Sequence, residues 1–325
     1  MMPGSRIIFY VLLMTVLFTG CNRGNRTKAE SDAQDSIKHL AVTNSDAFEM
    51  LVGLGAAENI VGINDISMRR SFFDKSRKWP SIGGNWRNPN VEAMIALKPD
   101  IVIGYKRWIE PEGFEDKLKP FHISVERVSC YYMSEYHSDL SLLASLVGKE
   151  SRADTMIRDF DRIVNMVKNA VTDMDVKRKA YIEYSDFTAM GAGSSSNEML
   201  ELIGAVNIAS KLGIQYPKVS TEWLLEENPD VIIKVVSADT ITASMYERVV
   251  KRAGWDRLDA VKNSRVYLIL PELCAGPRAM IGSLYFGKWC YPERFASIDP
   301  DSIHAYWMKR YYGFFPDNFV YMVHK

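Results

Sequence analysis

Two stretches of the chain decide the fold: Val91–Tyr105, which reads VEAMIALKPDIVIGY, and Thr221–Val236, which reads TEWLLEENPDVIIKVV. In each stretch a helical pattern with a glutamate near its start ends at a Pro-Asp pair, and a short apolar run typical of a buried strand follows. Glu92 and Glu222 both lie eight residues before the aspartate, and the two stretches are offset by 130 residues. The spacing predicts two copies of one helix–turn–strand unit.

A second motif is repeated in the same order. Glu49–Leu51 is followed by Gly55, and Glu198–Leu200 is followed by Gly204, with the glutamate six residues before the glycine in both copies. Asp46 with the glutamate three residues later is a variant of the capping box, so a helix is expected to open there. Asn88-Pro89 and Ser220 are the expected caps of the two helices that precede the Pro-Asp pairs.

A long helix is expected between the two copies. From Lys149 to Lys179 the chain has neither proline nor glycine, and apolar residues recur at steps of three and four. The pattern predicts an α/β fold of two related lobes, each with a mostly parallel sheet, joined by one long rigid helix. The expected boundaries are 39–147 for the N-terminal lobe, 148–178 for the linking helix and 179–325 for the C-terminal lobe.

The N-terminus carries an export signal. Residues 1–20 have one early arginine, an apolar run too short to span a bilayer comfortably and a small-residue end. The string FTGC resembles a bacterial lipobox, which predicts lipidation of Cys21; the alternative is an ordinary cleaved signal followed by a chance cysteine. The polar residues up to 38 read as a flexible tether. We therefore expect an extracytoplasmic, membrane-anchored lipoprotein, in the periplasm or on the cell surface.

Composition excludes several other classes. The 325 residues carry 40 Lys+Arg and 40 Asp+Glu, a formal net charge of +0, so no basic face for nucleic acid is indicated. Cys130, Cys274 and Cys290 allow at most one intrachain disulfide and match no zinc spacing. The five histidines are scattered without metal-site spacing, so neither a resident metal nor a cofactor is expected.

With these motifs in order, the chain resembles the helical-backbone (class III) substrate-binding proteins of ABC transporters, which serve uptake of ferric siderophores, haem and cobalamin. The resemblance is carried by Glu49–Ile63, Pro80–Gly104 and Tyr216–Ile233, and it covers roughly residues 38–313. The tail, with GPRAMIGSLYFGKWCYPERF, resembles the ferric-complex members most. The resemblance implies a non-enzymatic monomer with a ligand cleft between the lobes and a permease–ATPase complex as partner.

Candidate ligand residues follow from strand ends and from the resemblance. Ligands of open α/β sheets bind outside the carboxyl ends of the strands, which points to the residues after the strand that ends in IVIG. By the resemblance, Trp86 and Tyr105 fall where aromatic rings face a ligand, and Arg278 where an arginine lies near it. Met190, beside a glycine-rich turn, is either an axial haem ligand or a packing residue. The expected ligand-binding residues are Trp86, Tyr105, Lys106, Arg107, Met190 and Arg278.

The two repeat-related glutamates have a separate interpretation. Glu92 and Glu222 lie in the first turn of a helix, where the helix dipole alone favours a carboxylate. The resemblance implies instead that each docks onto arginines of the permease, and two equivalent acidic groups suit a partner with two-fold symmetry.

The cargo is less closely defined. Four cations expected near the cleft favour an anionic ferric chelate of the siderophore type: Arg87, Lys106, Arg107 and Arg278. Cobalamin is the next alternative, and haem or an oxyanion such as molybdate comes third. Other classes are an exported hydrolase or chelatase, against which the absence of GxSxG and HExxH motifs speaks, and a lipid-anchored sensor without a transporter.

Overall fold

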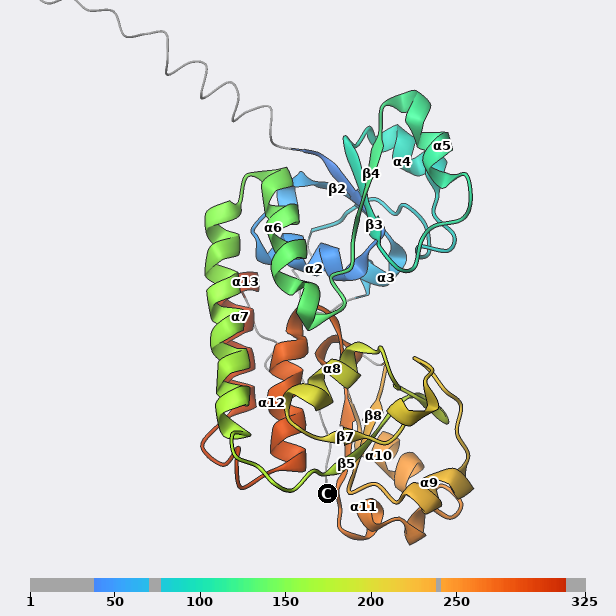
Figure 1. Cartoon of the computed structure of the whole chain (residues 1–325). Coiled ribbons are helices and arrows are strands. Elements are labelled where there is room, and N and C mark those ends of the chain that lie inside the picture. The colour runs from blue at the N-terminus through green and yellow to red at the C-terminus, as the bar shows by residue number, and fades with distance from the viewer. Residues whose placement is uncertain (1–37, 70–76, 238–240, 314–325) are drawn as a thin grey trace, which may run out of the picture. The chain divides into compact units, whose positions relative to one another are not determined.

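The computed structural model describes residues 38–69, 77–237 and 241–313. The expected α/β fold of two lobes with mainly parallel sheets and a long connecting helix is confirmed (Figure 1). None of the described helices is both long enough and apolar enough to cross a bilayer. The export signal, Cys21 and nearly all of the tether fall outside the described residues and stay predictions.

The first lobe is built on a four-stranded parallel sheet. Its strand order is β2-β1-β3-β4, so each crossover passes through a helix or loop on a face of the sheet. The strands are β1 (Leu40–Val42), β2 (Ile60–Ile63), β3 (Ile101–Tyr105) and β4 (Ser124–Val128). The helices are α2 (Ser45–Gly53), α3 (Asp65–Met68), α4 (Val91–Leu97), α5 (Phe114–Leu118) and α6 (Tyr136–Val147).

The second lobe repeats the plan with one difference. Its order is β6-β5-β8-β9, with β7 also paired to β5, and only β6 runs antiparallel. The strands are β5 (Lys179–Ser185), β6 (Thr188–Ala189), β7 (Val206–Asn207), β8 (Val231–Val235) and β9 (Val266–Ile269). The helices are α8 (Ser195–Leu202), α9 (Thr221–Glu227), α10 (Ala243–Val250) and α11 (Asp259–Lys262). Short 3₁₀ turns are η1 (Ala57–Asn59), η2 (Lys119–Phe121), η3 (Met133–Glu135), η4 (Ser210–Leu212), η5 (Trp255–Arg257), η6 (Pro271–Leu273) and η7 (Gly276–Arg278).

Three helices run beside the two lobes (Figure 1). The linking helix α7 is Glu150–Ala170, shorter at both ends than the expected 148–178. Its buried residues recur at the expected steps and are Ala153, Met156, Phe160, Ile163 and Val167. Helix α12 (Ala279–Cys290) packs against α7, and α13 (Pro300–Tyr312) contacts both α12 and α2 of the first lobe. The chain after the second sheet therefore returns to the first lobe.

The helix–turn–strand unit occurs twice, as predicted. Helices α4 and α9 each have 7 residues, strands β3 and β8 each have 5, and both helices end at a residue in the left-handed region, Lys98 and Asn228. Ser220 caps α9 as expected. The cap of α4 is Asn90 rather than Asn88, because the Asn90 side chain accepts a hydrogen bond from the Ala93 amide at 2.9 Å.

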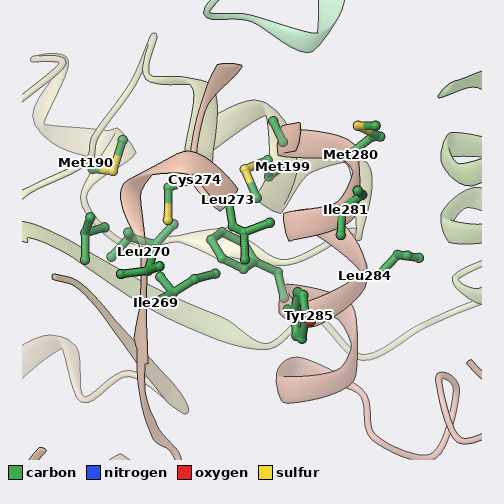
Figure 2. Close-up of a cluster of buried hydrophobic side chains, with 14 of the residues drawn as sticks. Met190, Met199, Ile269, Leu270, Leu273, Cys274, Met280, Ile281, Leu284 and Tyr285 are labelled. Carbon is green, nitrogen blue, oxygen red and sulfur yellow. The ribbon is translucent and has the colours of Figure 1, made fainter. Parts of the chain in front are cut away.

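Helix α12 is closely packed in the core of the second lobe. Figure 2 shows Met190, Met199, Leu273 and Cys274 in one buried cluster with side chains of α12. At Gly282 the helix passes so close to η6 that an added Cβ would lie 1.7 Å from the carbonyl oxygen of Leu273. Only glycine fits this crossing.

Gly282→Ala is therefore expected to lower the free energy of unfolding by about 3 kcal/mol, because the backbone of η6 must move away from α12. Gly53→Ala is the matched control: the atoms nearest to its Cβ would be side-chain atoms of Met156 and Tyr312, at 3.0 Å or more, and not backbone atoms. Chemical denaturation of both variants measures the difference. Equal stability of the two would contradict the tight crossing.

Candidate functional site

A cavity of about 510 Å³ lies where strands of both sheets end. Tyr105 is the last residue of β3, Val235 is the last of β8, and Cys274 follows β9, so the site sits at the carboxyl ends of the strands as expected. The lining residues are Asp46, Asn85, Trp86, Arg87, Tyr105, Trp108, Tyr131, Tyr184, Met190, Tyr216, Val235, Pro271, Cys274 and Ala275.

Five of these side chains form what we call the aromatic belt: Tyr105, Trp108, Tyr131, Tyr216 and Tyr184. In the first lobe the Trp108 ring packs edge-on against Tyr105 at 5.4 Å and against Tyr131 at 4.9 Å. In the second lobe the rings of Tyr184 and Tyr216 lie 5.5 Å apart. The hydroxyls of Tyr131 and Tyr216 join the two groups by a 2.8 Å hydrogen bond. The belt thus runs from one lobe to the other along the cavity.

Charge in the cavity is sparse and balanced. Among the described lining residues, Asp46 and Arg87 carry formal charge. The Arg87 guanidinium lies 4.7 Å from the centre of the Trp86 ring, in cation–π geometry. The Tyr105 hydroxyl is 2.8 Å from the Ser45 hydroxyl and 3.5 Å from a carboxylate oxygen of Asp46. The lining is therefore mainly aromatic, with one charge of each sign.

Asp46 is placed by the cap of α2. The Asn44 side chain accepts hydrogen bonds from the amides of Asp46 and Ala47 at 3.0 Å, so Asn44 is the cap and the expected capping role of Asp46 is wrong. On the other side, Gly276 has a φ of +78°, and a Cβ there would lie 3.0 Å from a carboxylate oxygen of Asp46. The loop of the second lobe can approach α2 this closely because residue 276 is glycine.

Of the six predicted ligand residues, the cavity brings together Trp86, Tyr105 and Met190. The Met190 sulfur also accepts a hydrogen bond from the Ser196 hydroxyl at 3.3 Å.

Lys106 and Arg107 are not among the residues that line this cavity. The Lys106 ammonium lies 3.5 Å from Glu135. The Arg107 guanidinium stacks 4.5 Å from the ring centre of Tyr132, beside a separate hollow of about 370 Å³. Both cations interact with these neighbouring groups and do not line the aromatic cavity.

Arg278, the sixth predicted ligand residue, lies outside the cavity. Its side chain is 3% exposed and does not line the cavity, because its guanidinium forms a buried ion pair with Glu49, with Nε 2.7 Å from Oε1. His304 lies 3.4 Å from the same guanidinium. Burial, together with the positive charge of Arg278, holds the pKa of His304 well below its usual range, so the imidazole is neutral at pH 7.

The lining residues that the sequence did not single out include Asp46, Tyr131, Tyr184 and Tyr216. Tyr184 lies near the end of β5, and Tyr131 follows β4 by three residues, so the strand-end rule applied to those strands would have found both. Tyr216 follows no regular strand, and no local signal marks it.

The three cysteines of the described chain are free and buried, and no disulfide forms among Cys130, Cys274 and Cys290. Burial raises the pKa of the Cys290 thiol to about 12 and that of Cys130 well above its usual range. Within residues 38–69, 77–237 and 241–313, no group of three or more His, Cys, Asp or Glu side chains is arranged to hold a metal ion.

Glu92 and Glu222 occupy the second position of α4 and α9 and are both exposed. The pKa of Glu222 is lowered by hydrogen bonds from its own backbone amide and from Ser220, so this carboxylate is ionised at neutral pH. The two side chains occupy equivalent positions in the repeated helix of the two lobes.

Comparison with known proteins gives one matching family model, described as periplasmic binding protein, over residues 40–273. The Bacillus subtilis (strain 168) protein named uncharacterized ABC transporter substrate-binding lipoprotein YvrC is 27% identical over 315 residues, 88% of this chain and 96% of that protein. A vitamin B12-binding protein of Pectobacterium carotovorum is 23% identical over 201 residues, 61% and 71% of the two chains. The solved structure of molybdate-bound MolA from Haemophilus influenzae has a TM-score of 0.75 at 21% identity, covering 86% and 94%, and shares the fold.

The hydroxyl pair of the belt predicts a dependence on alkaline pH. Burial raises the pKa of Tyr216 to about 12, above the ordinary value of about 10 for a tyrosine in an unfolded chain. The raised pKa stabilises the fold fully below pH 10, and this contribution is lost as the pH rises toward 12. Denaturant titrations at pH 9–12 are expected to show a smaller alkaline loss of stability for Tyr216→Phe than for wild type. An equal loss of stability with pH in wild type and in Tyr216→Phe would contradict the raised pKa of Tyr216.

Proposed function

The chain belongs to the periplasmic binding protein family, and on that premise we propose that it is the substrate-binding protein of an ABC importer for a bulky metal chelate. The observation that carries the proposal is the aromatic cavity at the strand ends of both lobes. Proteins of this family bind solutes, and the chain is proposed to deliver its ligand to a permease–ATPase complex rather than to transform it.

The size and walls of the cavity suit an organic ligand, and one as large as a corrinoid would extend beyond it. A volume of about 510 Å³ falls within the 300–1,000 Å³ of typical organic-ligand pockets. Six aromatic side chains in the lining supply broad, flat contact area. A chelate with an extended organic face uses this surface, whereas a bare oxyanion such as molybdate needs clustered donors and is disfavoured by the carboxylate of Asp46.

Because the charges in the cavity are balanced, we propose cobalamin as the first candidate ligand. The cationic argument for an anionic ferric chelate rested on four residues, of which Arg87 alone lines the cavity, where Asp46 balances it. A neutral corrinoid matches an aromatic lining without net charge. The similarity to a vitamin B12-binding protein agrees with this assignment.

A ferric siderophore is the second candidate, and Arg87 is the observation that favours it. Stacked on Trp86, its planar guanidinium faces the cavity and suits the oxygens of an anionic chelate. Haem comes third: Met190 lines the cavity and offers a thioether, but its sulfur is already hydrogen-bonded to Ser196.

Localisation and docking complete the proposal. Lipidation of Cys21 would anchor the protein, as a monomer, to an extracytoplasmic membrane surface, and the lipoprotein YvrC is a relative of matching length. Glu92 and Glu222, exposed at equivalent positions of the two lobes, are proposed to dock onto the permease.

The ligand is identified by titrating the purified chain with cobalamin, a ferric catecholate, ferric citrate, haemin and molybdate while following tryptophan fluorescence. Cobalamin is expected to quench saturably at submicromolar concentration, because Trp86 and Trp108 line the cavity. Trp86→Ala should weaken binding about tenfold or more by removing an aromatic wall. Trp223→Ala, on α9 and outside the lining, is the matched control and should bind as wild type.

Each outcome assigns the cargo. Selective binding of a ferric chelate would overturn the cobalamin assignment and support the second candidate. If none of the chelates binds, the chelate proposal is wrong, and molybdate binding alone would identify an oxyanion carrier.

The docking proposal is tested with Glu92→Ala and Glu222→Ala together. Uptake of the ligand by cells is expected to fall to background while the affinity of the purified chain stays unchanged, because neither residue lines the cavity. The control is Glu112→Ala with Glu226→Ala, which removes two other exposed carboxylates, one from each lobe. Undiminished uptake in the first double variant would exclude this docking role.

A further inference from the structure

Two repeat-related glutamates make contacts between the lobes. Glu49 in α2 and Glu198 in α8 occupy matching places in the repeated Glu-Met-Leu motif, and Gly55 and Gly204, six residues on, both have positive φ. Helices α2 and α8 belong to different lobes (Figure 1). Each carboxylate bonds to residues outside its own lobe, so one motif produces a cross-lobe contact in both copies.

The Glu49 contact is a buried ion pair. Arg278 places Nε 2.7 Å from one carboxylate oxygen and Nη2 3.4 Å from the other, and the two side chains are 3% and 1% exposed. The Tyr312 hydroxyl, from α13, lies 3.4 Å from the same carboxylate. The partners are 229 residues apart in sequence. Removing either member would leave an uncompensated buried charge, so the contact is strongly held.

The Glu198 contact is different in kind. Its carboxylate accepts hydrogen bonds from the Met133 amide at 3.0 Å and from the Ser134 hydroxyl at 2.5 Å. Ser134 is exposed and Glu198 is partly exposed. Water can replace these bonds at small net free energy, so this contact can break and re-form.

Met133 and Ser134 belong to a short segment, Tyr131–Ser134, which we call the strap. Every residue of the strap bonds to the second lobe. The Tyr132 hydroxyl donates to the carbonyl of Gly193 at 2.9 Å, the Tyr131 carbonyl accepts from the Gly276 amide at 3.0 Å, and the Tyr131 hydroxyl pairs with Tyr216. Because Tyr131 and Tyr216 also line the cavity, the strap forms part of its wall.

From this asymmetry we propose that Glu49–Arg278 is a fixed pivot and that the strap with Glu198 is a releasable clasp. The lobes open by breaking the hydrogen bonds of the strap, beginning at the partly exposed bonds to Glu198, while the buried ion pair keeps α2 attached to the second lobe. The clasp gates the aromatic cavity, and Glu198 acts as a positioning residue that holds the strap closed.

Hydrogen exchange of the ligand-free chain, resolved to single residues by mass spectrometry, tests the clasp. In Glu198→Ala the amide of Met133 loses its acceptor and should exchange about tenfold faster or more than in wild type. Glu198→Gln keeps one acceptor oxygen, so its exchange rate at Met133 should lie between the rates of wild type and Glu198→Ala. Glu201→Ala is the matched control: it lies on the same helix and bonds to Asn197 within that helix, so Met133 should exchange as in wild type.

The pivot is tested in the same measurement by the amides of α2, Ser45–Gly53. In Glu198→Ala these amides should keep their wild-type exchange rates, because the Glu49–Arg278 pair is intact. Equal acceleration in α2 and at Met133 would overturn the pivot, and an unchanged rate at Met133 would overturn the clasp. No ligand is needed, so this outcome is independent of the proposed function.

Discussion

A buried ion pair is the contact on which the remaining geometry depends. Neither the carboxylate of Glu49 nor the guanidinium of Arg278 reaches water, so each needs the other to remain charged inside the protein. Their pairing requires the middle of α2 to lie against the end of η7. That proximity brings Gly276 against Asp46 and places two cavity-lining segments, from different lobes, side by side.

The helices beside the lobes reinforce the same arrangement. Arg152 of α7 donates to the carbonyl of Gly53 at 2.7 Å and to that of Tyr311 at 3.3 Å, and thereby ties the end of α2 to the end of α13. The Tyr311 hydroxyl bonds to Asp159 of α7 at 2.6 Å. The first lobe is thus held by the linking helix and by the returning C-terminal helix.

The sequence predicted those features of the fold that depend on a local pattern of residues. Helix–turn–strand units, the linking helix and the strand-end position of Tyr105 follow from periodicity and from proline placement, and all three are found. Contacts between distant residues could not be predicted in this way. Nothing near Arg278 indicates a partner 229 residues earlier, and Asn88 and Asn90 are equally good caps until the backbone selects one.

The same limit explains why counting cations overstated the charge of the cavity. A cation on a folded chain pairs with whatever acceptor or ring lies nearest: Lys106 meets Glu135, Arg107 stacks on Tyr132, and Arg278 is buried on Glu49. Aromatic side chains are positioned mainly by packing and contact area, and not by a single ion pair. A cavity assembled from strand ends is therefore lined mainly by aromatic rings and carries little charge, which is why the aromatic belt is proposed as the ligand-binding surface.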